Sequence, residues 1–287
     1  MEGFTGILCS PFTGTKPKDR LVMQIKKYGA LCLFIGMISC GEYQYAEHNI
    51  PIDEPFTQRA VRQAETLDRR TSQFREEKSY PFYLGGEARF HVQVYYQNRD
   101  PLKVVVRIED GQWKQEEATY YLTNEKVFYI HSHGVLQEDS LESEIYFERK
   151  IYYLDGEVGR AVERRGQTPE LLKQADYIPF STAVIKPKYT DWYQYMLYEN
   201  YLRSVKGKGK FTYKLQGVEE SPEGQHFLVL EGEDGVKARF KIMESGTEYR
   251  ALEQRLQIYE GEKVEVDYIE QEQQGTVEYI FNEISKR

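Results

Sequence analysis

Two histidines separated by a single residue are the first candidates for chemistry in this sequence. His131 and His133 stand at the end of an alternating apolar run that begins at Val127. Side chains at i and i+2 of a β-strand share one face, so both imidazoles could reach one metal ion. A catalytic zinc ion needs a third protein ligand, and the candidates for it are His91, Glu138 and Asp139. The alternative is a strand end with solvated histidines.

An aromatic stripe is the second candidate. Thr190 or Asp191 can cap a helix that runs to about Val205 and connects two halves of the chain. The predicted face of this helix consists of Trp192, Tyr195, Tyr198, Leu202 and Val205. These rings could line a groove for a ligand. The alternative is a helix that packs between two domains, because aromatic stripes usually fill cores.

Motifs for other kinds of catalysis are missing. The sequence has no Gly-x-Ser-x-Gly, His-Glu-x-x-His, Walker or dinucleotide-binding fingerprint, and we predict no cofactor. The basic, glycine-rich segment 206–210 lacks the helix that follows a phosphate-binding loop, and we interpret it as a domain boundary. Carboxylates are abundant, so a hydrolase that uses two acidic residues stays open.

The cysteines and one apolar run indicate where in the cell the protein is located. The only cysteines are Cys9, Cys32 and Cys40. Lys26 and Lys27 precede an apolar run from Ala30 to Ile38, which is shorter than the roughly 20 residues of a membrane-spanning helix and typical of a signal peptide. The alternative is a buried helix of a soluble protein.

The sequence Met37-Ile38-Ser39-Cys40 resembles the lipobox of bacterial lipoproteins. In that family a small residue precedes an invariant cysteine, which receives a diacylglyceryl group before cleavage. The resemblance implies that residues 1–39 are a signal peptide, with a true start possible at Met23, and that Cys40 carries the lipid. It also implies an outer-membrane anchor, since Gly41 replaces the Asp that favours inner-membrane retention.

The charge balance disfavours nucleic acid as a partner. After residue 39 the chain has 33 basic and 44 acidic residues, a net charge of −11. Such a surface repels phosphate backbones unless a local basic patch overrides it. We therefore predict no nucleic-acid partner.

The fold class follows from periodicity and from the excess of tyrosine, of which there are 24. After a tether at 40–55, a helical apolar stripe covers about 57–77. Alternating segments separated by turns such as Asp110-Gly111 and Asp155-Gly156 then predict an antiparallel meander of about six strands. The helix would cover one face of this meander, and together they form a domain at 56–189.

Two further resemblances concern parts of the chain. Residues 149–160 resemble the tyrosine-rich hairpins common in uncharacterised secreted bacterial proteins. Residues 207–285 resemble the OB-fold barrel, because three strands, a helix and two strands are predicted in that order, with Gly261-Glu-Lys-Val-Glu-Val266 opening the fourth strand. The predicted fold class is α+β, mainly β: a helix-backed antiparallel meander, a connecting helix at 190–206 and a small OB-like barrel at 207–287.

Together these features predict a lipid-anchored protein of the bacterial cell envelope. Its expected role is that of a binding or scaffold module for a protein, peptide or glycan. The alternative is a metal- or carboxylate-dependent hydrolase of the envelope.

Overall fold

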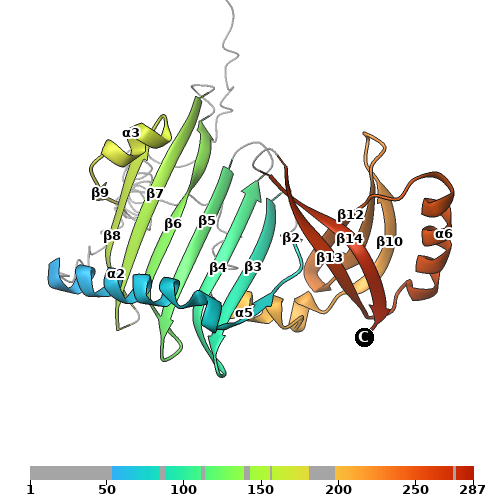
Figure 1. Ribbon diagram of the computed structural model, residues 1–287, viewed down its shortest axis with the longest axis horizontal. Coiled ribbons are helices and arrows are strands. Elements are labelled where there is room, and N and C mark those ends of the chain that lie inside the picture. Colours follow the sequence, from blue (N-terminus) through green and yellow to red (C-terminus); the bar gives the residue numbers. More distant parts are fainter. Residues whose placement is uncertain are drawn as a thin grey trace, which may run out of the picture. The chain divides into compact units, whose positions relative to one another are not determined.

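A computed structural model describes residues 54–84, 88–110, 114–138, 143–155, 157–180, 198–273 and 276–287. The predictions for the signal peptide, for residues 40–53 of the tether and for the first part of the connecting helix lie outside the described residues. Residues 54 and 55 were predicted to end the tether, and they begin the first described helix instead. The fold is mainly β, as the sequence predicts, and its 14 strands form one mixed sheet (Figure 1). Among the described helices, none is long and apolar enough to cross a bilayer.

Six consecutive antiparallel strands form the predicted meander, and each pairs with the next. They are β3 (Ala88–Gln97), β4 (Asp100–Asp110), β5 (Lys114–Thr123), β6 (Lys126–Glu138), β7 (Ser143–Leu154) and β8 (Glu157–Gly166). Tight turns connect β3 to β4, β5 to β6 and β7 to β8. Asn98, Asn124, Glu125 and Asp155 adopt positive φ in these turns, which is the conformation that tight hairpins require.

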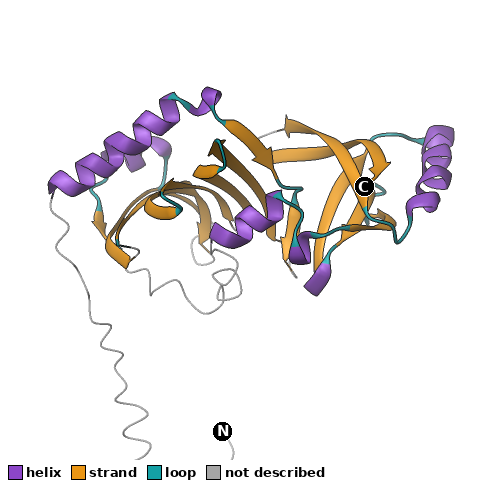
Figure 2. Cartoon of the chain, turned by 90° about the horizontal axis from the view of Figure 1, so that it is seen from below, coloured by secondary structure: helices purple, strands orange, loops and turns teal. Residues whose placement is uncertain are grey.

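The helix α2 (Glu54–Arg69) lies across one face of the meander (Figures 1 and 2). Ala60 and Ala64 on its buried side pack against Tyr121, Tyr129 and Tyr152. The predicted helix continued to residue 77, and this part of the prediction is wrong. After a 3-10 turn, η1 (Thr71–Gln73), the chain forms β1 (Arg75–Lys78), because its backbone pairs with the exposed edge of β3.

The second half of the chain contains three strands, a helix and two strands, as predicted. These are β10 (Lys214–Glu220), β11 (His226–Glu231), β12 (Val236–Ile242), α6 (Gly246–Leu256), β13 (Val264–Gln273) and β14 (Thr276–Lys286). Between the two halves lie α3 (Pro169–Gln174), β9 (Ile178–Pro179) and α5 (Tyr198–Val205). Short 3-10 turns complete the described elements: η4 (Gly209–Phe211), η5 (Glu233–Gly235) and η6 (Gln257–Tyr259).

The last five strands keep the order β10–β11–β12–β14–β13, with β12 and β14 parallel where Lys241 faces Ile280. The prediction of a small OB-like barrel at 207–287 is wrong on closure, because ladders between the described strands do not close this sheet into a barrel. Instead, two isolated bridges join β10 to residues 260–263. The backbone N–H of Gly261 donates to the carbonyl of Leu215 over 2.8 Å. Because Gly261 adopts a φ of +76°, the chain turns there and no ladder can continue.

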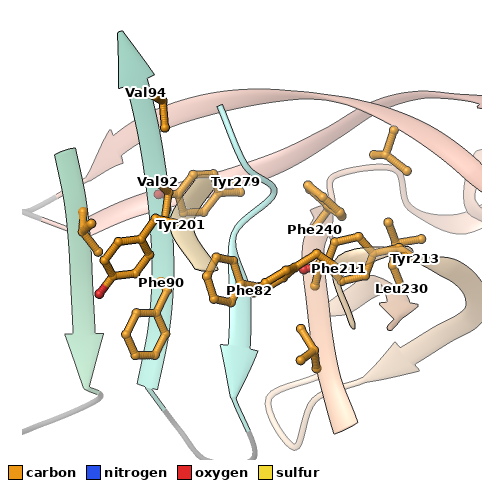
Figure 3. Close-up of a cluster of buried hydrophobic side chains, with 14 of the residues drawn as sticks. Phe82, Phe90, Val92, Val94, Tyr201, Phe211, Tyr213, Leu230, Phe240 and Tyr279 are labelled. Atoms are coloured by element: carbon orange, nitrogen blue, oxygen red, sulfur yellow. The ribbon is translucent and has the colours of Figure 1, made fainter. Parts of the chain in front are cut away.

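One short strand joins the two halves. β2 (Phe82–Leu84) pairs with β3 on one side and with β12 on the other. The ring of Phe82 stacks on Phe90 of β3 at 5.5 Å and meets the edge of Phe211 at 5.0 Å between ring centroids (Figure 3). The regions predicted as separate domains, 56–189 and 207–287, therefore contribute to one hydrophobic core.

Candidate functional site

The aromatic stripe is only partly described. Trp192 and Tyr195 lie outside the described residues, as does Cys40, and Tyr198 is the first residue of α5. The residue of α5 that enters the core is Tyr201, which is 2% exposed and lies 5.7 Å from Tyr120 between ring centroids. The described part of the stripe thus packs as a core element, and its buried side includes a tyrosine that the predicted face omitted.

The two histidines on β6 do share a face, as predicted. Their ring centroids are 5.9 Å apart, and the ring of His133 is exposed. The Nε2 atom of His131 lies 2.9 Å from Oε1 of Glu148 on β7. Arg164 on β8 donates from Nε to the other oxygen of the same carboxylate over 2.7 Å.

Glu148 is therefore the centre of an ion cluster. Partial burial raises the pKa of this carboxyl, but hydrogen bonds from His131 and Arg164 and the charge of Lys150 outweigh burial and hold the pKa well below its usual range. The carboxylate stays ionised, and its two oxygens contact His131 on β6 and Arg164 on β8. This cluster is built to join β6, β7 and β8.

The third proposed metal ligand lies too far away. His91 on β3 shares a cross-strand row with His133, but Arg107 and Glu117 stand between them, so three strand spacings separate the two histidines. Three spacings amount to about 14 Å. Glu138 ends β6, and Asp139 lies outside the described residues. Among the described residues no three His, Cys, Asp or Glu side chains come close enough to hold a metal ion.

His91 belongs instead to a buried joint between the meander and β13. Its side chain is 1% exposed, and its Nε2 atom lies 3.2 Å from the hydroxyl of Tyr268 and 3.9 Å from Glu270. Burial lowers the pKa of His91 most, Glu270 raises it, and the positive charges of Arg107, Lys78 and Arg89 lower it, so that the pKa falls from 6.5 to about 4 in all. The imidazole is thus neutral at neutral pH.

A pocket beside α5 is the candidate for ligand binding. It encloses about 300 Å³ and opens to solvent. Three segments build it: the β3–β4 turn, the β5–β6 turn and the helix α5. We call it the α5 pocket, and its lining consists of Tyr96, Arg99, Pro101, Glu125, Glu199, Leu202, Arg203 and Lys206.

The walls of the α5 pocket differ in character. Tyr96 and Pro101 are buried and form a fixed base, and the ammonium group of Lys206 lies 5.7 Å from the centroid of the Tyr96 ring. Arg99, Arg203, Lys206, Glu125 and Glu199 are exposed around this base. We find no ion pair within 4.0 Å that joins any of these five side chains to another described residue.

A second hollow lies on the β13–β14 hairpin and has a similar volume of about 300 Å³. Its lining includes Glu265, Asp267 and Glu283, and the amide of Asn282 donates to Asp267 over 2.6 Å. Residues of β13 and β14 thus form its walls, and Asn282 of β14 is the hydrogen-bond partner of Asp267. It offers no cation and no aromatic surface for a ligand.

Comparison with known proteins returned no match to any protein-family model, curated protein or solved structure. The function of this chain must therefore be argued from its own residues. Of the two hollows, the α5 pocket is the one in which both cations and carboxylates without ion-pair partners among the described residues line the walls.

Proposed function

We propose that this protein is a lipid-anchored binding module of the bacterial cell envelope, attached to the outer membrane through Cys40. The α5 pocket carries the binding part of the proposal, because it places both cationic and anionic groups around a buried aromatic base. A protein, peptide or glycan partner remains the expected class.

The order of segments supports the anchor. Lys26 and Lys27, the apolar run and Ser39-Cys40 come first, and the first described helix begins at Glu54. The 13 residues between Cys40 and Glu54 could reach at most about 45 Å. A tether of that length lets a folded body bind partners at a distance from the lipid surface.

No specific observation favours the hydrolase alternative. His131 is engaged with Glu148, and His91 is buried three strands from His133. The charged side chains of the α5 pocket form a mixed set of cations and carboxylates. Such a set is suited to recognition through ion pairs.

Membrane fractionation tests the anchor. We expect the native protein in the membrane fraction and a Cys40→Ser variant outside the outer-membrane fraction, because the variant lacks the acylated thiol. Cys32→Ser is the matched control, since Cys32 lies in the segment that cleavage removes. Equal distribution of Cys40→Ser and the native protein would overturn the anchor.

A further inference from the structure

We propose that the α5 pocket binds a ligand that carries both a carboxylate and an ammonium group, the chemistry of an amino acid or a short unblocked peptide. This inference rests on the proposed binding role and specifies its ligand class. It follows from the charges, the local backbone and the size of the pocket.

The cations of the pocket are suited to a carboxylate. Arg99 extends from the β3–β4 turn, and Arg203 and Lys206 come from the end of α5 and the residue after it. Guanidinium groups bind carboxylates through two parallel hydrogen bonds. Elsewhere on the same sheet the arginines are already paired, as in Arg107–Glu117 at 3.0 Å and Arg164–Glu148. The pocket cations lack such partners among the described residues.

The carboxylates of the pocket are suited to an ammonium group. Glu199 and Arg203 are four residues apart on α5, a spacing at which oppositely charged side chains commonly pair. No ion pair joins them within 4.0 Å in the described structure. Glu199 and Glu125 come from two different segments, have no ion-pair partner among the described residues, and could each bind a positive group of a ligand.

The backbone at Glu125 gives an independent indication. Asn124 and Glu125 are the central residues of the β5–β6 turn and have φ values of +49° and +62°. Turns of this kind favour Asn-Gly, because a side chain at the second position is strained. A glutamate at that position lowers stability while it places a carboxylate at the pocket. Such a local conflict is typical of functional sites.

The dimensions limit the ligand. A volume of about 300 Å³ lies at the lower end of small-molecule sites. The buried base of Tyr96 and Pro101 does not depend on exposed side chains, so the floor is formed before binding. A free amino acid or the end of a short peptide fits these dimensions, whereas a folded protein domain would contact only the rim.

Calorimetric titration of the full chain in detergent tests the proposal. The probes are alanyl-glutamate, the same dipeptide with an acetylated amino end, the same dipeptide with amidated carboxyl groups, and free glutamate. We expect the unblocked dipeptide to bind and each blocked form to bind at least about tenfold more weakly, which corresponds to one lost charged contact. Free glutamate separates an amino-acid site from a peptide site.

Three variants sharpen the test. Arg203→Gln should weaken dipeptide binding about tenfold, and Lys208→Gln is the control, because Lys208 is exposed and does not line the pocket. Glu125→Gly should weaken binding and yet raise the thermal midpoint by about 2–4 °C, since glycine relieves the turn. A merely structural Glu125 would not lower affinity while raising stability.

The contrary results are equally definite. The ligand class is wrong if the unblocked dipeptide fails to bind at millimolar concentration, if the blocked forms bind equally well, or if Arg203→Gln and Lys208→Gln behave alike. The fractionation experiment tests the anchor alone. If the protein is held in the membrane through Cys40 but binds none of the probes, this inference is wrong, and the proposal of a lipid-anchored protein is unaffected.

Discussion

At the scale of single residues, His91 shows how this fold encloses a titratable group. Its imidazole lies among Lys78, Arg89 and Arg107 on three strands of the meander side and Glu270 and Tyr268 on β13. The other charged groups of this joint are arranged in pairs, such as Lys78 with Glu270 at 2.9 Å. Protonation of His91 would place a positive charge in a buried site near three other positive charges and one negative charge, and it therefore destabilises the folded state.

This arrangement predicts acid sensitivity. The pKa of His91 is lowered from 6.5 to about 4 in the folded protein. Between these pH values the unfolded chain binds a proton at His91 that the folded chain does not bind. The contribution of neutral His91 to the free energy of unfolding is therefore fully present above pH 6.5 and is lost as the pH falls toward 4. The loss should approach about 3 kcal/mol. Urea unfolding between pH 7 and about pH 5.5, where ordinary Asp and Glu side chains are still mostly ionised, measures the first part of this loss.

His91→Gln should flatten this pH dependence, because glutamine does not titrate. His133→Gln is the matched control, since His133 is exposed on the same sheet face and should leave the slope unchanged. An unaltered slope in His91→Gln would show that another group is responsible.

At the scale of elements, the three residues of β2 have the largest consequence for the architecture. β2 pairs with β3 and with β12, and Phe82 at its start is 1% exposed. Its ring contacts rings from both halves, Phe90 and Phe211. The sheet is continuous because of this strand.

Phe82→Ala should destabilise the protein by about 3–5 kcal/mol, the usual loss for a buried phenylalanine. Tyr83→Ala is the control on the same strand, because Tyr83 is half-exposed and should cost less. Chemical unfolding followed by tyrosine fluorescence and by circular dichroism gives both values. Similar losses for the two variants would contradict the central position of Phe82.

The same elements show what the sequence could predict. Period-2 runs between strong turn signals predict each strand of the meander, and these predictions are confirmed. The helix at 57–77 was predicted too long, because local periodicity does not reveal that β3 has an exposed edge with which Arg75–Lys78 can pair. β2 is too short to produce a periodic signal. Tyr201 lies on the predicted face of α5, three residues after Tyr198 and four before Val205, so helical periodicity alone could have included it.

The candidate sites were less predictable than the fold. The shared face of His131 and His133 followed from strand alternation, but the partner Glu148 depends on the register between β6 and β7. The α5 pocket combines residues from three segments that are distant in the sequence. Its one local signal is the Asn124-Glu125 pair, in which glutamate occupies a position that favours glycine.

At the scale of the whole molecule, the two halves of the described chain share one large hydrophobic core, and a smaller cluster lies under α2. Rings from the meander, from α5 and from the last five strands meet in it (Figure 3). The two buried joints, at Phe82 and at His91, link the same parts of the chain. A folded body of this kind, joined to the tether and the lipidated Cys40 that we propose, would be an anchored binding module.

The intact mass of the protein purified from a membrane fraction tests this account most directly. We predict a chain that begins at Cys40 and carries two or three acyl groups. The Cys40→Ser variant should lack this species. A native chain that is unmodified and still contains residues 23–39 would contradict the account, because the apolar run would then belong to the mature protein.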